Sequence, residues 1–447
     1  MRVLGTYCGE TRSDCRVSQP RCNATGTVNP DYTQASRLVL WDAFAGGTEG
    51  RWLITFEGVT KRYPDGTVAV DNLDLDVPDG KTMVLVGPSG CGKTTTLRMI
   101  NRLVDPSAGR ILLNGDDIRA QDPARLRRGI GYVIQQTGLF PHRTVEDNIA
   151  TVPVLNGWRR AKARARAREL LTTVGLDPAL AKRYPHQLSG GQQQRVGVAR
   201  ALAADPPVLL MDEPFSAVDP VVRGQLQEQL IALQNELRKT IVLVTHDIEE
   251  AIKVGDLVAL YHPHGTLAQL GPPERLLGSP ADDYVAGFVG FDRGIRRLSF
   301  FRTDGLSLSA GPVLPASATV AAAVKTGEPW ILVVGGEADL TPRGWVSTDR
   351  LAGLDGDTRL ADAATDSFGH TFTVGDDSLR AALDAAVLSP AGVAIGVDDD
   401  GRVVGIASFD QLRAAVQAAQ AAQDALDAKD VLDEQVARQG QSPGATG

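Results

Sequence analysis

The sequence has few cysteines and no long apolar run, and each shortage excludes a class of protein. Four cysteines among 447 residues are too few and too scattered for a disulfide framework. Cys8, Cys15 and Cys22 lie seven residues apart, which matches neither the short cysteine pairs of a zinc site nor a helical stripe of thiols. No stretch approaches the ~20 apolar residues that cross a bilayer, and the N-terminus lacks the pattern of a signal peptide. We therefore predict a chain that neither spans a membrane nor is exported by a recognisable route.

Positive charge is also in short supply. The 46 Lys and Arg residues are outnumbered by 54 Asp and Glu residues, so the net charge is −8 and the pI about 5.4. This balance disfavours broad binding of nucleic acid through neutralised phosphates. A basic run at residues 159–168 alternates with Ala and continues into Glu169, which favours a solvated helix face over a patch for lipid or RNA.

The composition and length predict a globular chain with more than one core. The sequence is 43% hydrophobic and 22% charged, and its length exceeds one ordinary domain. Residues 1–53 show no sustained period of 2 or 3.6, so we predict a disordered N-terminal extension. Because a self-consistent domain begins only at Ile54, we also hypothesise that the extension is absent from the mature protein. A peptide starting near residue 1, mapped from the native cell extract, would contradict this.

Two patterns predict an α/β domain over residues 54–290. Residues 54–63 alternate like a strand, and Leu73–Val77 is its predicted hairpin partner across a turn at residues 64–66. Continuous apolar runs then indicate buried parallel strands, with helical segments between them. These runs are residues 83–87, 208–211 and 241–244, and the helix after the first is predicted from Thr95 to about Leu103.

The C-terminal third differs in composition from the rest of the chain. It is rich in Gly, Asp and Ala and contains a repeated octet. Residues 344–351 and 405–412 share Gly, Ser, Asp and Leu at matching places, 61 residues apart. Two copies at this period suggest a duplicated α/β unit over residues 295–416 rather than a solenoid, which needs three or more copies. Residues 417–447 are rich in Ala and Gln and acidic, and are predicted to form a helix that ends in disorder.

A glycine-rich loop follows the first apolar strand. Gly87-Pro-Ser-Gly-Cys-Gly-Lys-Thr94 fits the phosphate-binding loop, in which successive backbone N–H groups surround phosphate oxygens at a helix N-terminus. We expect Lys93 to reach the β and γ phosphates and the Thr94 hydroxyl to hold Mg²⁺. Cys91 belongs to this loop rather than to a thiol site.

A second strand ends in two carboxylates. Asp212 and Glu213 directly follow the apolar run at residues 208–211. A pair of this kind alone is typical of a solvated turn, and the upstream phosphate loop changes that interpretation. We expect Asp212 to order the Mg²⁺ shell and Glu213 to polarise the attacking water.

A third motif indicates a composite site. Leu188-Ser-Gly-Gly-Gln192 stands just before a predicted helix, where small residues can form a second anion cradle. One domain needs one triphosphate cradle, so the second predicts a head-to-tail dimer. Ser189 and Gly191 of one copy would then close on the γ-phosphate held by Lys93 of the other.

Together these motifs resemble the ATP-binding subunits of ABC transporters. The phosphate loop, the Leu188–Gln192 run, the end of the strand before Pro214 and Thr245-His246-Asp247 match in order and rough spacing throughout residues 54–290. The resemblance implies an ABC-type ATPase domain with a mostly parallel core sheet, an antiparallel β subdomain and a helical subdomain. It also implies a homodimer as the working state, with ATP and Mg²⁺ as cofactors.

The resemblance implies a role for each matching residue. Glu213 corresponds to the catalytic base and His246 to the switch histidine that positions water and γ-phosphate. Asp219 matches the loop that communicates across the dimer. For the glutamine that senses Mg²⁺ and the membrane subunit we favour Gln135, with its neighbour Gln136 as the rival. The implied nucleotide-binding residues are Tyr63, which stacks on adenine, and Gly87, Pro88, Ser89, Gly90, Cys91, Gly92, Lys93, Thr94, Thr95 and Gln135. The implied Mg²⁺ ligands are Thr94, Gln135 and Asp212. The ATP bound by the partner subunit is implied to contact Ser189, Gly190, Gly191 and Gln192.

A closer resemblance points to importers of compatible solutes. Residues 131–142 and 283–293 look like those of subunits that power uptake of glycine betaine, carnitine, choline or proline. This implies integral membrane permease subunits and an extracytoplasmic solute-binding protein as partners, no nucleic acid, and a place at the cytoplasmic face of the cell membrane. The ATPase does not touch the solute, so no residue identifies the cargo.

The C-terminal repeats resemble a pair of CBS modules, with two departures. Lys and Arg minus Asp and Glu over residues 295–416 gives 10 − 16 = −6, which disfavours docking on anionic lipid. The ribose-binding aspartate expected three residues after the repeat's Ser is replaced by Arg350 and Gln411, while Asp349 and Asp410 stand one place earlier. Adenosine binding is therefore disfavoured, and a working sensor and a retained dimerisation module stay open as alternatives.

The sequence disfavours two other functional classes. A non-transport ABC ATPase acting on nucleic acid or ribosomes usually has two such domains in one chain or a long coiled-coil insertion, and this sequence has neither. A chain that merely binds a regulatory ligand would not need Glu213 and His246. An ABC importer ATPase for another small solute remains the alternative to the hypothesis of compatible-solute uptake.

Overall fold

The computed structural model describes residues 51–440, apart from residues 136–137, 217 and 364. The predictions made for residues 1–50, Gln136 and residues 441–447 lie outside this part of the chain. Among the described residues, none of the helices combines the length and apolar character of a membrane span.

A six-stranded sheet forms the centre of the N-terminal half, in the order β10-β9-β3-β8-β7-β6. Its strands are β3 (Thr82–Val86), β6 (Ile130–Val133), β7 (Val208–Asp212), β8 (Thr240–Val244), β9 (Leu257–Tyr261) and β10 (Leu267–Gly271). All neighbours run parallel except β10, which joins the edge antiparallel. Every residue of β3, β7, β8 and β9 is buried, which explains their continuous apolar sequences. The loops after β3, β7 and β8 leave the sheet at one edge, where ligands of such folds bind.

A smaller antiparallel sheet covers one side of this core, in the order β2-β1-β4-β5. Its strands are β1 (Trp52–Arg62), β2 (Val68–Pro78), β4 (Ala108–Leu113) and β5 (Asp116–Asp117). The buried side chains of β1, including Ile54 and Phe56, share one hydrophobic cluster with Leu97 and Ile100 of helix α2 (Lys93–Ile100) and with strands of the central sheet. The predicted hairpin between β1 and β2 is confirmed.

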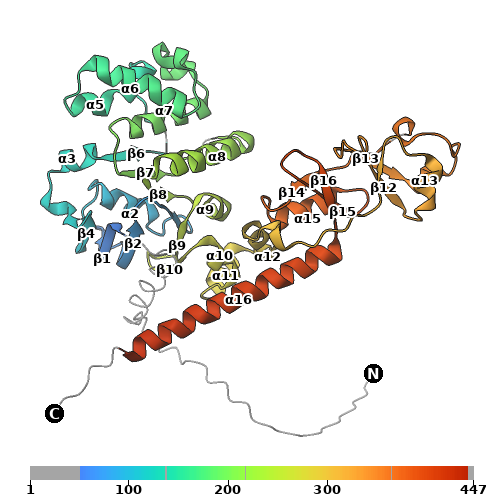
Figure 1. Ribbon diagram of the computed structural model, residues 1–447. Helices are drawn as coiled ribbons and strands as arrows, with labels where there is room; N and C mark the ends of the chain where they lie inside the picture. Colours follow the sequence, from blue (N-terminus) through green and yellow to red (C-terminus); the bar gives the residue numbers. More distant parts are fainter. Residues whose placement is uncertain (1–50, 136–137, 217, 364, 441–447) are drawn as a thin grey trace, which may run out of the picture.

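A group of helices lies on the far side of the central sheet from β1 and β2 (Figure 1). It contains α4 (Val145–Ile149), α5 (Thr151–Leu155), α6 (Arg160–Thr173) and α7 (Gly190–Leu202), and the other helices of this half are α3 (Pro123–Arg128), α8 (Pro220–Leu237) and α9 (Ile248–Val254). Short 3₁₀ turns span Ile118–Ala120, Pro178–Lys182 and Pro185–Gln187. Ala163 and Ala167 of the basic run are buried on one face of α6, while Arg164 and Arg168 pair with Asp147 and Glu146. The run is thus a helix face with paired charges.

The C-terminal part contains two similar three-stranded sheets. They are β11-β12-β13, made of β11 (Val313–Pro315), β12 (Trp330–Val334) and β13 (Pro342–Ser347), and β14-β15-β16, made of β14 (Thr371–Thr373), β15 (Val393–Val397) and β16 (Val403–Ser408). In each sheet the first pair is parallel and the second antiparallel. The repeated octets fall on β13 and β16 and the helix that follows each, so the sequence repeat is a structural repeat.

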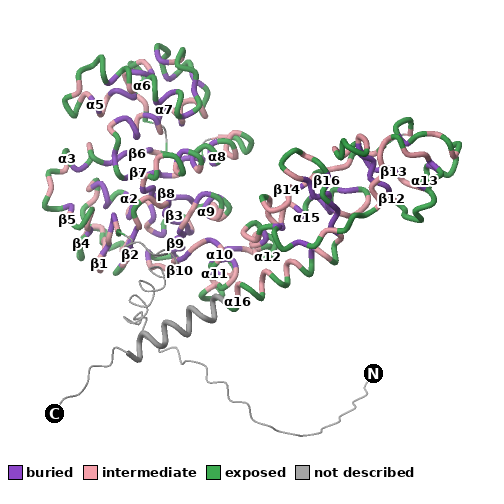
Figure 2. Tube along the Cα trace, in the orientation of Figure 1, coloured by how far each residue is buried: buried purple, intermediate pink, exposed green. Residues whose placement is uncertain are grey.

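Helices connect and surround these sheets. They are α10 (Pro273–Gly278), α11 (Asp283–Val289), α12 (Arg293–Arg297), α13 (Val320–Lys325), α14 (Thr348–Leu351), α15 (Leu379–Leu388) and α16 (Phe409–Gly440), with 3₁₀ turns at Leu298–Phe300, Thr303–Gly305 and Leu360–Asp362. The long helix α16 runs back toward the N-terminal half in Figure 1. Figure 2 shows buried residues along the sheets of both halves and exposed residues on the outer helices.

Helix α2 differs from its predicted range, Thr95 to about Leu103. It begins at Lys93, because Gly92 ends the loop in a left-handed conformation with φ 95°. It ends at Ile100, because Asn101 leaves the helical region and Arg102 has φ 51°. Residues favourable to a helix therefore continue past its end, and the backbone at these two residues sets the boundary.

Candidate functional site

The phosphate loop between β3 and α2 encloses the buried ammonium group of Lys93. Lys93 is 6% exposed, and its Nζ donates to the carbonyl oxygens of Gly87 at 2.7 Å and Pro88 at 2.8 Å. No carboxylate of the described residues forms an ion pair with it. A buried ammonium whose hydrogen bonds go to carbonyls is suited to an incoming anion, since an uncompensated buried charge is costly.

Two glycines of the loop, Gly87 and Gly92, leave no room for side chains. A Cβ on Gly92 would lie 2.0 Å from the carbonyl oxygen of Ala69, and one on Gly87 would lie 2.9 Å from that of Tyr261. Gly90 has open space and φ +80°, so the loop turns there toward solvent with its backbone uncovered. This is a cradle that a Cβ would disrupt, and it fits a polyphosphate. Cys91, a residue of the same loop, is buried.

A hydroxyl and a carboxylate meet beside this loop. The Thr94 Oγ1 donates to Asp212 Oδ1 at 3.0 Å, linking the start of α2 to the end of β7. Burial raises the pKa of the Asp212 carboxyl, and the Thr94 hydrogen bond opposes that rise. These oxygen donors suit Mg²⁺, which takes few protein ligands together with phosphate oxygens and water. Within the described residues, no cluster of three or more His, Cys, Asp or Glu side chains offers a dedicated metal cage.

Glu213 is held between two side chains predicted to act with it. Its Oε1 lies 3.2 Å from His246 Nδ1, and its Oε2 accepts from Gln135 Nε2 at 2.8 Å. The backbone at Glu213 is left-handed, with φ 45°, and its N–H donates to the Val244 carbonyl at 3.0 Å. This strained turn directly after β7 directs the carboxylate toward the loop edge of the sheet. Gln135 contacts Glu213 here, and no hydrogen bond joins it to the Thr94–Asp212 pair.

The second predicted cradle is a helix N-terminus closed upon itself. Ser189 caps α7, with its Oγ accepting from Gln192 N at 3.3 Å and its N–H donating to Gln192 Oε1 at 3.0 Å. Gly191 has no space for a side chain, because its Cβ would lie 2.9 Å from Val222. The polar groups of Ser189 and Gln192 contact each other rather than the phosphate loop of the same chain.

Two further predicted residues lie at the margins of the site. Tyr63 is half-buried, and its hydroxyl lies 3.4 Å from Thr95 Oγ1 at the start of α2. Asp219 caps α8, and its Oδ1 accepts from Val222 N at 3.1 Å. Tyr63 is therefore beside the phosphate loop, while Asp219 is at the start of the helix that contacts Gly191.

The structure adds residues that the sequence analysis missed. A small polar cavity beside Glu213 and His246 is also lined by Ser216, Arg223, Thr245, Asp247 and Glu250. Glu250 is buried, accepts from Thr245 Oγ1 at 2.6 Å, and burial raises the pKa of its carboxyl. Its position in the first turn of α9, which Asp247 next to His246 caps, was a signal in the sequence. Glu250 also pairs with Arg223 of α8 at 3.8 Å, and nothing in the sequence indicated this pairing.

Comparison with known proteins places this chain in a family. The family model described as ABC transporter matches residues 70–216. The osmoprotectant import ATP-binding protein OsmV of Salmonella typhimurium is 50% identical over 279 residues, which cover 61% of this chain and 71% of the relative. The glycine betaine uptake system ATP-binding protein YehX of Escherichia coli is 52% identical over 248 residues, covering 55% of this chain and 80% of the relative. The chain belongs to the ABC transporter family of ATP-binding proteins.

Other similar proteins cover shorter parts. The choline transport ATP-binding protein OpuBA of Bacillus subtilis is 53% identical over 247 residues, 55% of this chain and 65% of the relative. The dimeric structure of a bacterial ABC transporter cassette is 35% identical, with a TM-score of 0.45, and covers 49% of this chain and 98% of that chain. The predicted ABC-type ATPase fold, with its core sheet, antiparallel sheet and helical group, is confirmed.

Proposed function

We propose that this chain hydrolyses ATP to drive uptake of a compatible solute through a separate membrane permease. The observation that carries the proposal is the arrangement at one sheet edge. There Glu213 is held by Gln135 and His246, next to the Thr94–Asp212 pair and the buried ammonium of Lys93. A base, an oxygen-ligand pair and a cationic cradle are the parts that phosphoryl transfer to water needs.

Each side chain has one part in the proposed reaction. Lys93 exchanges its two carbonyl partners for phosphate oxygens, and the backbone of residues 87–92 surrounds the same anion. Thr94 and Asp212 would hold Mg²⁺, which when bound neutralises charge on the phosphates. Glu213 accepts a proton from the attacking water, while His246 and Gln135 fix the direction of its carboxylate. Tyr63 and Thr95 would lie against the nucleotide's base and phosphates.

The working state that we propose is a homodimer of ATPase domains. Ser189, Gly190, Gly191 and Gln192 present a helix N-terminus whose polar groups do not contact the phosphate loop of their own chain. Facing a second copy, this N-terminus would meet the partner's γ-phosphate, with Asp219 at the contact. Binding of ATP would thereby close the dimer, and hydrolysis would reopen it.

The substrate class rests on the similar proteins. OsmV is an osmoprotectant importer subunit, YehX belongs to a glycine betaine uptake system and OpuBA to choline transport. We propose a quaternary amine such as glycine betaine, carnitine or choline, or proline, with an extracytoplasmic solute-binding protein in the same complex. Uptake of these solutes by cells that make this chain with its permease would test the choice, and uptake of none of them would overturn it.

We propose that residues 295–416 are a tandem CBS-like regulatory module. The side chains at the place of the expected ribose-binding aspartate have other partners. Arg350 forms an ion pair with Asp366 at 2.9 Å, and Gln411 Oε1 accepts from Ser408 N at 2.8 Å. This supports a module that does not bind adenosine. Saturable binding of adenosine nucleotides to an Lys93→Ala variant, measured by calorimetry, would contradict it.

The proposal is tested by ATP hydrolysis of the wild type and Glu213→Gln. We expect turnover to fall at least ~100-fold in the variant, because it loses the general base, while ATP and Mg²⁺ trap it as a dimer. Phosphate release and size-exclusion chromatography measure the two effects. Wild-type turnover in Glu213→Gln would mean that the base is another residue.

The permease contact has a candidate surface on the helical group. A groove lined by Phe140, Arg143 and Leu155 lies between α4 and α6, with Phe140 39% and Leu155 59% exposed. Exposed apolar side chains with basic neighbours suit an amphipathic cytoplasmic loop that carries acidic residues.

We predict that Phe140→Asp abolishes co-purification with the permease while the isolated chain keeps its ATP turnover. Val387→Asp, on the C-terminal part where Val387 is 64% exposed, is the matched control and should co-purify normally. Detergent-solubilised pull-down measures both. If the Phe140→Asp chain still co-purifies with the permease, the permease contacts another surface of this chain.

A further inference from the structure

The loop that carries His246 is held on both sides by its neighbours in the sequence. Thr245, just before it, is 1% exposed, and its N–H donates to the carbonyl oxygen of Leu85 on strand β3 at 3.1 Å. Asp247, just after it, caps helix α9. The side chain of His246 is exposed and contacts Glu213. The two residues beside the histidine therefore set the direction of its ring.

The side chain of Thr245 connects the two sides of this loop. Its Oγ1 donates to Glu250 Oε2 at 2.6 Å and accepts from the Asp247 N–H at 3.0 Å. Glu250 is 5% exposed, so its carboxylate is largely removed from water. A buried carboxylate is tolerated where hydrogen bonds or a positive charge compensate it. The position of the His246 loop therefore depends on the groups that compensate Glu250.

Arg223, in the first turn of α8, supplies the positive charge. Its Nε lies 3.8 Å from Glu250 Oε1, and its Nη1 lies 3.8 Å from Asp247 Oδ2. These are distances of ion pairs, and they are too long for hydrogen bonds. The Nε atom is buried and has no hydrogen-bond partner among the described residues. A buried donor without a partner is costly, so a small movement of α8 that completes these bonds would be favoured.

Helix α8 joins this loop to the surface that is proposed to meet the second copy. Asp219 caps the helix, and its carbonyl oxygen accepts from the Arg223 N–H at 2.8 Å, so the two residues lie in one helical turn. Val222, in the same turn, lies against Gly191 of the α7 cradle. A contact of the partner subunit with Asp219 or with this cradle would therefore act on the turn that carries Arg223.

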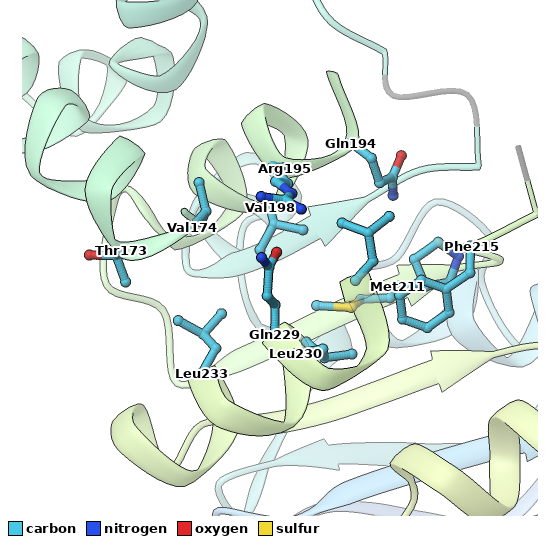
Figure 3. Close-up of a pocket in the computed structure, with 12 residues that line it drawn as sticks. Thr173, Val174, Gln194, Arg195, Val198, Met211, Phe215, Gln229, Leu230 and Leu233 are labelled. Atoms are coloured by element: carbon cyan, nitrogen blue, oxygen red, sulfur yellow. The ribbon is translucent and has the colours of Figure 1, made fainter. Parts of the chain in front are cut away.

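The rest of α8 is packed closely against the helical group. In Figure 3, Gln229, Leu230 and Leu233 of α8 face this group across a small hollow. The hollow has a volume of about 50 Å³, so little free space separates α8 from α6 and α7. Close-packed elements transmit displacement. A shift of α7 on contact with the partner subunit would therefore carry α8 with it.

We propose that Arg223 is a positioning residue for His246, and this inference rests on the proposed function. When the partner subunit packs against Asp219, α8 shifts and the guanidinium closes on Glu250 and Asp247 through charge-assisted hydrogen bonds. The two carboxylates then hold the loop on both sides of the histidine, so its ring is fixed in the direction that hydrolysis needs. Contact between the subunits is thereby coupled to hydrolysis, while binding of ATP by the phosphate loop does not depend on Arg223.

The first experiment compares two ion pairs that join the same two helices. Lys253 of α9 pairs with Glu228 of α8 at 3.4 Å, away from the His246 loop, and serves as the matched control. At a protein concentration where the ATP-bound chain is fully dimeric, Arg223→Met should lower kcat about 10- to 100-fold and change KM for ATP less than about twofold. Lys253→Met should keep the wild-type kcat and KM. Wild-type turnover in Arg223→Met, or an equal loss in Lys253→Met, would overturn the inference.

Two further variants separate positioning from a loss of folding. Arg223→Lys keeps a positive charge beside the two carboxylates and should restore part of the turnover that Arg223→Met loses. The double variant Arg223→Met with Glu250→Gln removes the charge together with its buried partner, so it should be more stable in urea than Arg223→Met alone. Its turnover should stay as low as that of Arg223→Met. Recovery of turnover together with stability would mean that the loss came from unfolding, and would overturn the inference.

The closing experiment asks whether Arg223 acts through His246. His246→Ala should lower turnover, and adding Arg223→Met to it should cause little further loss, because the side chain to be positioned is gone. Losses that multiply in the double variant would mean that Arg223 acts independently of His246, and would overturn the inference. The proposed function fails by a different result, namely a wild type that does not hydrolyse ATP or a Glu213→Gln variant that turns over like the wild type.

Discussion

At the scale of single residues, the sequence motifs predicted the type of reaction, and the structure shows which of the side chains are in contact. The types and spacing of Lys93, Asp212, Glu213 and His246 were sufficient to predict an ATP site, because few other arrangements place these groups after buried strands. The hydrogen bond of Gln135 to Glu213 could not be predicted, since it joins residues 78 positions apart through the fold.

Glu250 provides a pH-dependent prediction at this scale. Burial is the main cause of its raised pKa, with Asp247 also raising it and the Thr245 hydrogen bond and Arg223 lowering it. A carboxyl with a raised pKa in the folded state binds its proton more tightly there than in the unfolded chain. Its burial therefore costs nothing below pH ~4.5, the usual value, and the cost grows as the pH rises through the folded-state pKa.

We predict that Glu250→Gln flattens the fall in stability just above pH ~4.5, by at most about 1.4 kcal/mol per pH unit. The Gln amide oxygen can still accept from Thr245, so the hydrogen bond is kept while the buried charge is removed. Urea unfolding at a series of pH values from 4 to 7.5 measures this. Asp212 has a raised pKa with the same sign and remains in both proteins, so it cancels in the comparison. Parallel stability curves for the two proteins would mean that burial of the Glu250 carboxylate does not lower stability.

At the scale of elements, apolar runs located the buried strands closely, while helix ends depended on backbone details. Strands β3, β7 and β8 agree with their predicted runs within one or two residues, because continuous burial requires continuous apolar sequence. The end of α2 was placed about three residues too late, because a left-handed residue at Arg102 has no distinctive side chain. The repeat of 61 residues predicted a duplicated unit, and the two matching sheets confirm it.

Helices α7 and α16 begin with the same type of capping pair, so mutating each cap tests which of the two helices contributes to the ATP site. Ser189 of α7 and Ser408 before α16 each form a reciprocal pair with a Gln three residues later. We predict that Ser189→Ala and Ser408→Ala each lower the free energy of unfolding by about 1 kcal/mol. Only Ser189→Ala should also weaken ATP-driven dimerisation, because only α7 is proposed to face the partner's nucleotide. Urea unfolding and ATP-dependent chromatography separate the two effects, and equal loss of dimer in both variants would remove the special role of α7.

At the scale of the whole molecule, the hydrophobic clusters divide between the two halves. The two large clusters are formed by buried residues between Leu53 and Val289, and the three smaller ones by residues between Leu298 and Leu412. Between them the chain passes through Phe291, which is fully exposed, and α12. Contacts across this point include the ion pair of Arg296 with Glu249 at 3.0 Å. The change of composition near residue 290 lies close to this division, as expected if each core needs its own set of apolar residues.

This division predicts where the native protein is cut. An exposed aromatic residue in a turn is a preferred site for chymotrypsin, and Phe291 is exposed where Phe140 is only 39% exposed and is held by two backbone hydrogen bonds to Asn148. Within residues 51–440 we expect the first cleavage after Phe291. It separates a part that ends at Phe291 from a part that begins at Asp292, and both remain folded, with ATP turnover in the first. Mass spectrometry of a brief digest and an assay of the separated fragments measure this. Phe291→Ala should move the first cut elsewhere, and a first fragment that aggregates on release would mean that the N-terminal core depends on the C-terminal sheets after all.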